Sequence, residues 1–155
     1  MRALPMFLVG LVGSTNADGV EPSAGVSIPV PRDVQEVVFR KELAAASNKY
    51  AYCLSVDDRD PELQVIKAVQ RKDILIVAAS DCVAASDTLR GSYLKSNHQQ
   101  AMIVLIGPYK PVDDSTGSLK VETYQGGLDA SGGTLLLRRT PDGWVAESSG
   151  YRWES

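Results

Sequence analysis

The sequence predicts an α+β fold, with one or two N-terminal helices packed on a curved, mainly antiparallel sheet of four to six strands. Helical periodicity and short apolar runs alternate between residues 31 and 80, whereas strand-like alternation, interrupted by turn residues, follows from residue 100 onward. Helices that precede a run of strands are typical of the α+β class. The chain has 155 residues, 44% of them hydrophobic and 23% charged, which is enough for one ordinary core. We place a single domain in residues 31–155.

A helix is predicted over residues 31–46, because Pro31 suits a first helical turn and the valines of "VQEVVF" recur at helical spacing. A second helix is predicted to begin at Pro61, with Asp60 as its N-cap, and to end near Arg71. The acidic string "DDRDPE" could bind calcium, but it lacks the glycine-punctuated loop of such sites. We therefore interpret its acidic residues as the start of this second helix.

Two strands are predicted in the first half of the chain. "KYAYCLSV" (residues 49–56) alternates its side chains between two faces, and "DILIVAAS" (residues 73–80) is a continuous apolar run, as in a buried strand. Residues 81–98 hold no strong pattern and are expected to form a loop with a turn of helix near residues 88–93.

The second half is predicted to form an antiparallel meander. "AMIVLIG" is a central strand that Gly107 and Pro108 end, and "SLKVETYQ" alternates cleanly. "GTLLLRR" and "GWVAESS" form a hairpin around the turn "TPDG", after which "YRWES" closes the sheet. Residues 125–133 join two strands as a turn or bulge, or as a contact loop. Trp144 follows the turn and is expected to fill the end of the core.

The first 17 residues have the layout of a secretory signal peptide. Arg2 precedes the apolar run "ALPMFLVGLVG", and small or polar residues precede a cut before Asp18. The run is too short to cross a bilayer core of about 30 Å as a helix. The alternative is a buried strand or helix at the start of the domain. We predict a signal peptide over residues 1–17, a flexible leader over residues 18–30, and export to the periplasm or the extracellular space.

Export changes how the two cysteines are interpreted. Cys53 and Cys82 are an even pair, and an oxidising compartment favours a disulfide between them. Such a bridge closes a loop of about 30 residues and contributes about 3–4 kcal/mol. The alternative is two buried free thiols. Two cysteines and the distant His98 lack metal-ligand spacing, so we expect no metal and no cofactor.

The charge of the chain excludes two classes of partner. The net charge is −3, and no run of basic residues is longer than the pair Arg138-Arg139. A nucleic-acid-binding protein needs a basic patch, and an acidic protein is repelled by anionic membrane surfaces. We therefore expect no nucleic-acid partner, and no membrane insertion after signal cleavage.

The strand "MIVLIG", the alternating "LKVETY" and the ending "LLLRRTPDGWVAES" resemble the closing strands of the nuclear-transport-factor-2-like and cystatin-like families. The chain also resembles small exported bacterial proteins of unknown function. The resemblance covers the C-terminal third and implies a cone-shaped sheet that can enclose a pocket. Some relatives of this fold are isomerases or dehydratases that use an aspartate, often with a histidine or tyrosine, but no residue here matches their motifs one by one. The Gln-x-Val-x-Gly loop of cystatins is missing, because the nearest string, "QVIKAV", has no glycine.

No catalytic residue is assigned, because the chain has no Gly-x-Ser-x-Gly elbow and Cys53 lies in an apolar strand rather than an electropositive setting. Aromatic and polar residues that could line a pocket or a protein-binding surface are the candidate contacts. These residues are Tyr50, Tyr52, His98, Tyr124, Gln125 and Asp129.

The sequence therefore predicts an exported binding protein, such as an envelope accessory, an inhibitor or an immunity-type protein, whose partner is another protein. The alternative is a small-ligand carrier or an isomerase- or dehydratase-like pocket enzyme of the cone-shaped fold. A third interpretation is a structural subunit of an envelope assembly. Binding surfaces carry no fixed motif, so the partner is not named by any string of residues.

Overall fold

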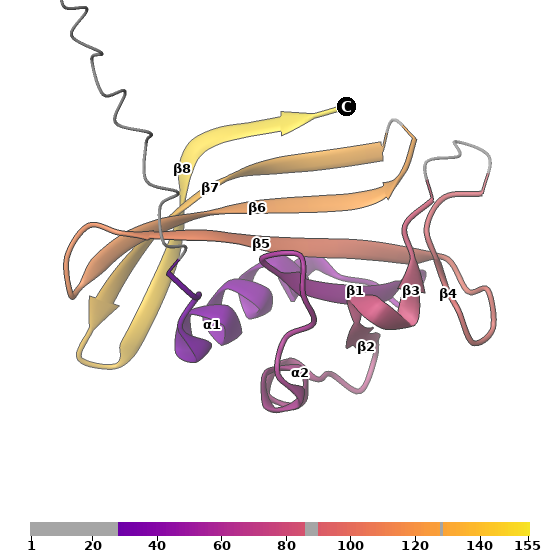
Figure 1. Cartoon of the computed structure of the whole chain (residues 1–155), viewed down its shortest axis with the longest axis horizontal. Helices are drawn as coiled ribbons and strands as arrows, with labels where there is room; N and C mark the ends of the chain where they lie inside the picture. The colour runs from indigo at the N-terminus through magenta and orange to yellow at the C-terminus, as the bar shows by residue number, and fades with distance from the viewer. Residues whose placement is uncertain (1–27, 86–89, 128) are drawn as a thin grey trace, which may run out of the picture.

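A computed structural model of the chain describes residues 28–85, 90–127 and 129–155. The predicted signal peptide and most of the predicted leader lie outside the described residues. A six-stranded sheet with the order β2-β1-β5-β6-β7-β8 forms the body of the protein, and a two-stranded sheet, β3-β4, lies at one end. Figure 1 shows α1 and α2 together below this sheet.

The two predicted helices are present, with shifted bounds. α1 spans Arg32–Glu42 and continues into a short 3-10 turn, Leu43–Ala45, close to the predicted range. α2 spans Leu63–Val69 and is preceded by Glu62. Asp60 therefore does not cap it, because the Asp60 carboxylate accepts the backbone N–H of Ser80 at 2.8 Å instead.

Eight strands form in the described residues, and strand outweighs helix. Their bounds are β1 Ala51–Val56, β2 Leu75–Ala78, β3 Cys82–Val83, β4 Tyr93–Leu94, β5 Ala101–Pro111, β6 Thr116–Gly126, β7 Asp129–Thr140 and β8 Gly143–Glu154.

The expectation of a mainly antiparallel sheet of four to six strands is wrong. β1 pairs in parallel with both β2 and β5, so the sheet is mixed, and β3 and β4 add strands where a loop with a helical turn was expected. The parallel part arises because α2 carries the chain from β1 across to β2, after which the chain returns to the other side of β1 as β5. Only the coarse α+β class stands.

β5 also differs from the prediction, because Gly107 and Pro108 do not end it. The strand continues through a cis Gly107-Pro108 peptide to Pro111, and its register against β6 shifts between Ile106 and Tyr109. The prediction that residues 125–133 join two strands as a turn or bulge is confirmed, since Gly126 pairs with Asp129 and the register shifts between Tyr124 and Gly126. The "TPDG" hairpin is confirmed by the pairing of β7 with β8.

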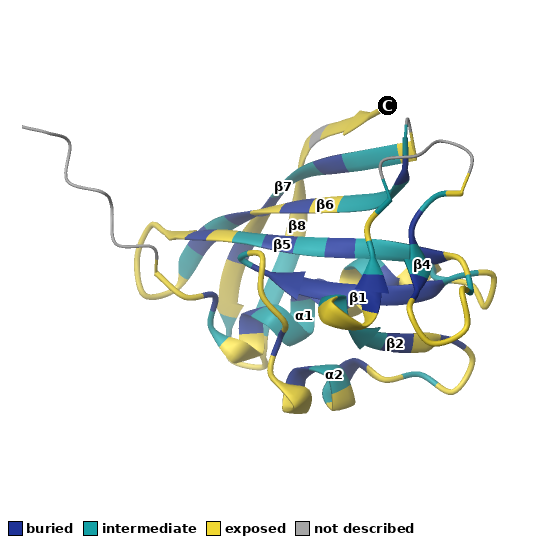
Figure 2. Ribbon diagram, turned by 45° about the vertical axis from the view of Figure 1, so that its right-hand side comes forward, coloured by how far each residue is buried: buried dark blue, intermediate teal, exposed yellow. Residues whose placement is uncertain are grey.

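The main core lies between the sheet and the helices. Val34, Val38 and Phe39 of α1 are fully buried there against strand residues such as Leu54 and Ile106. All six residues of β1 are buried, and Figure 2 shows this strand as buried along its whole length. The core therefore has β1 at its centre, covered on both faces.

The predicted end-of-core role of Trp144 fits this packing, because Trp144 packs against the main core together with Ala146. Val30, the last residue of the predicted leader, is also buried in that core. The ordered fold therefore begins slightly before the predicted domain boundary at residue 31.

The predicted disulfide joins Cys53 of β1 to Cys82 of β3, 29 residues apart. The bridge belongs to a second apolar cluster on the sheet face away from the helices, which also includes Ala51, Leu94 and Ala101. β3 and β4 therefore cover one end of that face, and the rest of it, toward β6, β7 and β8, carries no helix (Figure 1). We call this uncovered part the open face.

Candidate functional site

The topology points to one edge of the sheet as the candidate site. β1 and β5 are parallel neighbours, and the chain leaves β1 toward β2 but leaves β5 toward β6. Where connections diverge in this way, the loops beyond the carboxyl ends of the strands separate and leave a crevice in which ligands bind. In this protein that position lies just after Val56 and Ile106, the last aligned pair of the two strands.

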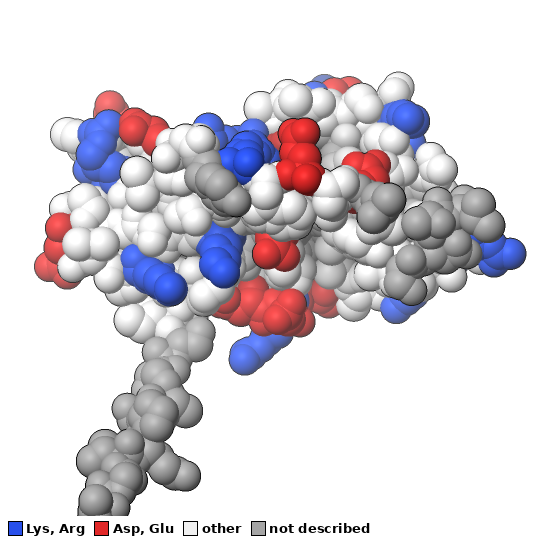
Figure 3. All heavy atoms as spheres, turned by 90° about the horizontal axis from the view of Figure 1, so that it is seen from above, with Lys and Arg blue, Asp and Glu red and all other residues white. Residues whose placement is uncertain are grey.

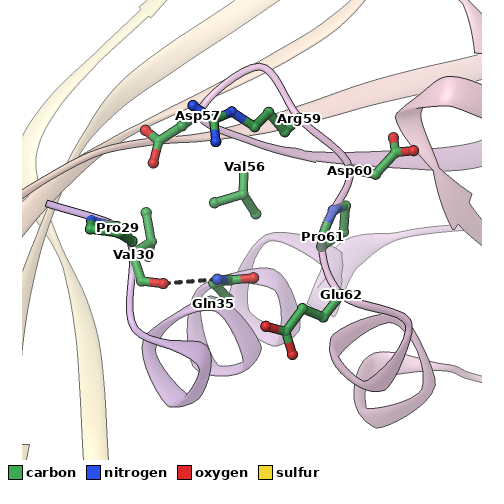
Figure 4. Close-up of a pocket in the computed structure, with 9 residues that line it drawn as sticks. All are labelled: Pro29, Val30, Gln35, Val56, Asp57, Arg59, Asp60, Pro61 and Glu62. Atoms are coloured by element: carbon green, nitrogen blue, oxygen red, sulfur yellow. Dashed lines mark hydrogen bonds between the residues drawn. The ribbon is translucent and has the colours of Figure 1, made fainter. Parts of the chain in front are cut away.

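Two hollows lie at this position, and Asp57 lines both of them. The first has a volume of about 290 Å³ and lies between the start of α1 and the segment from β1 to α2. The second, of about 240 Å³, lies between Asp57 and the open face and includes Glu122. We call the two hollows together the Asp57 crevice. Figure 4 shows the first hollow with Val56 between Asp57 on one side and Gln35 on the other.

The backbone places the Asp57 carboxylate firmly in the crevice. The Asp57 N–H donates to the Ile106 carbonyl at 3.0 Å, and its φ of 48° is in the left-handed region, which Asp tolerates better than most residues. The side chain approaches Gly107 so closely that a Cβ there would lie 2.1 Å from Asp57 Oδ1. The carboxylate therefore occupies space that a side chain at position 107 would need.

Burial raises the pKa of Asp57, because a charged carboxylate loses water there. The positive charge of Arg59 lowers this pKa and the negative charge of Asp58 raises it, and the net direction is upward. Asp60, by contrast, has its pKa lowered by its hydrogen bonds to Ser80. Asp57 is thus a carboxylate of the crevice whose charged form is disfavoured by burial.

Gln35, which lines the first hollow, carries a side-chain oxygen that accepts no hydrogen bond from the described residues. Its Nε2 donates to the Val30 carbonyl at 2.8 Å, which fixes the amide. Its Oε1 is buried, and no described residue donates a hydrogen bond to it. Buried polar atoms normally have a partner, so this oxygen is an uncompensated acceptor in a residue that lines the first hollow.

The lining of the crevice is mainly acidic. Five carboxylates and two basic groups contribute to it, namely Asp57, Asp58, Asp60, Glu62, Glu122, Arg59 and Lys120. Figure 3, which views the molecule from the side away from the helices, shows acidic side chains gathered near the middle of that face. No group of three or more potential metal ligands forms among the described residues. The acidic lining of the crevice suits a positively charged hydrogen-bond donor.

The predicted contact residues do not gather in one place. Tyr52 is buried in the main core, where its hydroxyl accepts the Ser47 N–H at 2.9 Å. Tyr50 packs against the edge of that core, with Lys49 Nζ 4.9 Å from its ring centroid. Asp129 is exposed and lies near enough to Lys49 to help raise the pKa of that amine, after the larger effect of Tyr50.

The remaining three predicted residues lie toward β3 and β4. The Tyr124 hydroxyl donates to the Ala85 carbonyl at 2.5 Å, and the Gln125 carbonyl accepts the Ser92 N–H. His98 stacks on Tyr93 with ring centroids 5.3 Å apart, and both rings line a separate surface hollow of about 420 Å³.

None of the six predicted contact residues lines the Asp57 crevice. The string "DDRDPE", which begins with Asp57, was interpreted only as a metal loop or a helix start, and Gln35 was not singled out. The available signal was an acidic pair directly after a buried strand. That signal becomes specific only once β1 is known to lie between two parallel neighbours.

The comparisons with other proteins identify no relative. No family model matches the chain, and no curated protein or solved structure matches it either. The resemblance to the nuclear-transport-factor-2-like and cystatin-like families stays a prediction. In the part of the chain that the structure describes, no helix is both long and apolar enough to cross a membrane.

Proposed function

We propose that the protein is an exported binding protein and that the Asp57 crevice accepts a positively charged group of its partner. The observation that carries this proposal is the half-buried Asp57 carboxylate at the divergence of β1 and β5, with its pKa raised by burial. A cation placed there supplies the counter-charge that Asp57 lacks, and its N–H groups can donate to the Asp57 carboxylate.

Export is supported by two features. The apolar run within residues 1–17 follows the pattern of a secretory signal, and a structural disulfide such as Cys53–Cys82 persists best in an oxidising compartment. Expression of the full chain in a host with a secretory pathway tests this part. We expect the measured mass of the exported protein to match a chain that begins at Asp18. An unprocessed chain retained in the cytoplasm would contradict it.

Binding of a cationic group is tested with a defined pair of small probes. N-acetyl-arginine amide carries the charge, and N-acetyl-citrulline amide has nearly the same shape without it. We expect NMR titration of the exported protein to shift the amides around Asp57 with the arginine probe and much less with the citrulline probe. Asp57→Asn should weaken arginine binding about tenfold, as expected for the loss of a charge-assisted contact.

The matched control is Asp142→Asn, which removes an exposed carboxylate in the turn between β7 and β8. This variant should bind the arginine probe as the unmodified protein does. Equal shifts with both probes, or unchanged binding by Asp57→Asn, would mean that the crevice does not recognise charge.

A small-ligand carrier or pocket enzyme is the second candidate, and the same aspartate favours it. A carboxyl with a raised pKa in an open hollow is what general acid or base chemistry needs. A panel of uncharged carbonyl compounds separates the two functions. A stabilising shift in melting temperature with such compounds, absent with the arginine probe, would favour the pocket enzyme.

A further inference from the structure

We propose that Glu122, Gly132 and Trp153 form a shelf on the open face that receives an arginine or lysine side chain of the partner protein. This inference rests on the proposed function and extends it, because the shelf adjoins the Asp57 crevice. Three features carry it: the register of the strands, the packing of one indole ring and the distribution of charge.

The register brings Glu122 and Trp153 to either side of a glycine. Leu105 of β5 is aligned with Glu122 of β6, Glu122 with Gly132 of β7, and Gly132 with Trp153 of β8. Directly opposed residues point to the same face of a sheet, and neighbouring strands lie about 4.8 Å apart. Because Gly132 has no side chain, nothing stands on the strand between Glu122 and Trp153.

The indole of Trp153 fills the place that a side chain at position 132 would take. A Cβ built on Gly132 would lie 2.8 Å from Cζ2 and 2.9 Å from Nε1 of Trp153. The ring therefore rests directly on the β7 backbone and reaches inward over the sheet. Gly132 is buried, whereas Trp153 remains 37% exposed, so part of this large aromatic surface stays open to a ligand.

Charge selects a cation as the occupant of this surface. Glu122 is exposed and forms no ion pair with any residue that the structure describes. It shares the second hollow of the crevice with Asp57 and Asp58, where Lys120 is the basic residue of the lining. A cation over an indole face gains cation–π attraction, and here it gains the nearby carboxylate as well.

Other occupants fit less well. An apolar side chain on Trp153 would remove water from Glu122 without replacing its hydrogen bonds, which is costly. An anion would be repelled by Glu122 and by the two aspartates beyond it. A basic side chain that crosses Trp153 meets Glu122 first and the Asp57 crevice next, so one extended basic segment of a partner protein can use both.

The test uses the exported full chain and the peptide acetyl-Ala-Arg-Ala-amide, with the same peptide carrying citrulline as the uncharged probe. The two variants of the shelf are Trp153→Leu, which keeps an apolar side chain, and Glu122→Gln, which keeps the shape and removes the charge. Asp114→Asn, in the exposed turn between β5 and β6, is the matched control. The affinities of all variants are measured by NMR titration. Variants that keep Trp153 are also measured by fluorescence in a Trp144→Phe background, in which Trp153 is the remaining tryptophan.

We expect the arginine peptide to bind Trp153→Leu about fivefold to thirtyfold more weakly, with a smaller loss for Glu122→Gln and none for Asp114→Asn. Unchanged binding by both Trp153→Leu and Glu122→Gln overturns the shelf. If Asp57→Asn alone then loses the peptide, the crevice stands without the shelf. If both shelf variants lose the peptide and Asp57→Asn does not, the shelf stands and the crevice proposal fails.

Discussion

Asp57 combines burial and negative charge at one residue. Burial raises the pKa of its carboxyl from an ordinary value of 3.8, so the folded protein binds this proton more tightly than the unfolded chain does. A group of this kind lowers stability as pH rises from the unfolded pKa through the raised folded pKa. The residue at the centre of the proposed site is therefore also one that destabilises the fold at neutral pH.

The first prediction concerns the loss of stability that ionisation of Asp57 causes as pH rises. Asp57→Asn should raise the free energy of unfolding relative to the unmodified protein at about pH 7, and this gain should disappear below pH 3.8. Urea unfolding at the two pH values measures it. Asp113→Asn is the control of opposite sign, because hydrogen bonds from Ser115 and Thr116 lower the pKa of Asp113. The loss of stability caused by Asp113→Asn should be present at neutral pH and should vanish as pH falls. A pH-independent effect of Asp57→Asn would contradict the prediction.

The second prediction concerns the glycine that Asp57 approaches. Gly107 has a φ of 123° and Gly143 a φ of 119°, but a Cβ on Gly143 would meet nothing within 4 Å. Both alanine variants carry backbone strain of about 1–3 kcal/mol. Gly107→Ala should lose more stability than Gly143→Ala, because it also displaces the Asp57 carboxylate. Chemical denaturation compares them, and equal losses would show that the contact with Asp57 has no energetic consequence.

At the scale of elements, β3 and β4 are the part of the fold that depends most on a covalent link. Each has two residues, and pairs this short are not stable alone. They are held by the Cys53–Cys82 bridge, by the small apolar cluster around it, and by the hydrogen bond from the Tyr124 hydroxyl to the Ala85 carbonyl. The position of β3 and β4 on the sheet is therefore decided by tertiary contacts.

The third prediction tests that dependence. The double variant Cys53→Ala/Cys82→Ala should lose about 3–4 kcal/mol of stability, and the amides of Ser92 and Leu94 should exchange faster with solvent than those of β6 and β7. Hydrogen exchange and urea unfolding measure both effects. The unmodified protein under reducing conditions should behave like the variant. Unchanged protection of Ser92 and Leu94 would mean that packing alone holds β3 and β4 in place.

At the scale of the whole molecule, the first helix and the last strand are joined by an ion pair 110 residues apart in the chain. Arg152 donates to the Glu42 carboxylate at 3.2 Å, and the Glu42 side chain is only 4% exposed whereas that of Arg152 is 48% exposed. A carboxylate that is nearly buried needs its partner more than an exposed one does. This pair therefore ties the end of α1 to the C-terminal part of β8.

The fourth prediction compares this pair with a fully exposed one. Arg152→Gln should cost about 1–2 kcal/mol, after allowance for solvent screening at the half-exposed guanidinium. Arg138→Gln, which breaks the exposed pair with Glu147, should cost about 0.5 kcal/mol or less. Thermal unfolding at low and high salt measures both. Equal costs would show that the burial of Glu42 adds nothing.

Local patterns in the sequence were sufficient to predict the helices, most strands and the final hairpin, whereas the disulfide was predicted from the even pair of cysteines and the expected export. Valines at helical spacing predicted α1, the alternation of side chains predicted β6, and the turn "TPDG" predicted the β7–β8 hairpin. Each of these features depends on residues a few positions apart, whose backbone preferences act locally. The α+β class follows from their order.

Only the tertiary structure decided which strands pair and what that pairing assembles. Side-chain alternation is the same for parallel and antiparallel neighbours, so the position of β1 between β2 and β5 could not be predicted from the pattern of "KYAYCLSV". That position creates the divergence at Asp57, and the register of β6, β7 and β8 sets Glu122 beside Trp153 across Gly132. The sequence by itself determined both helices, most strands and the final hairpin, whereas both proposed sites depend on contacts between residues distant in the chain, which no local preference specifies.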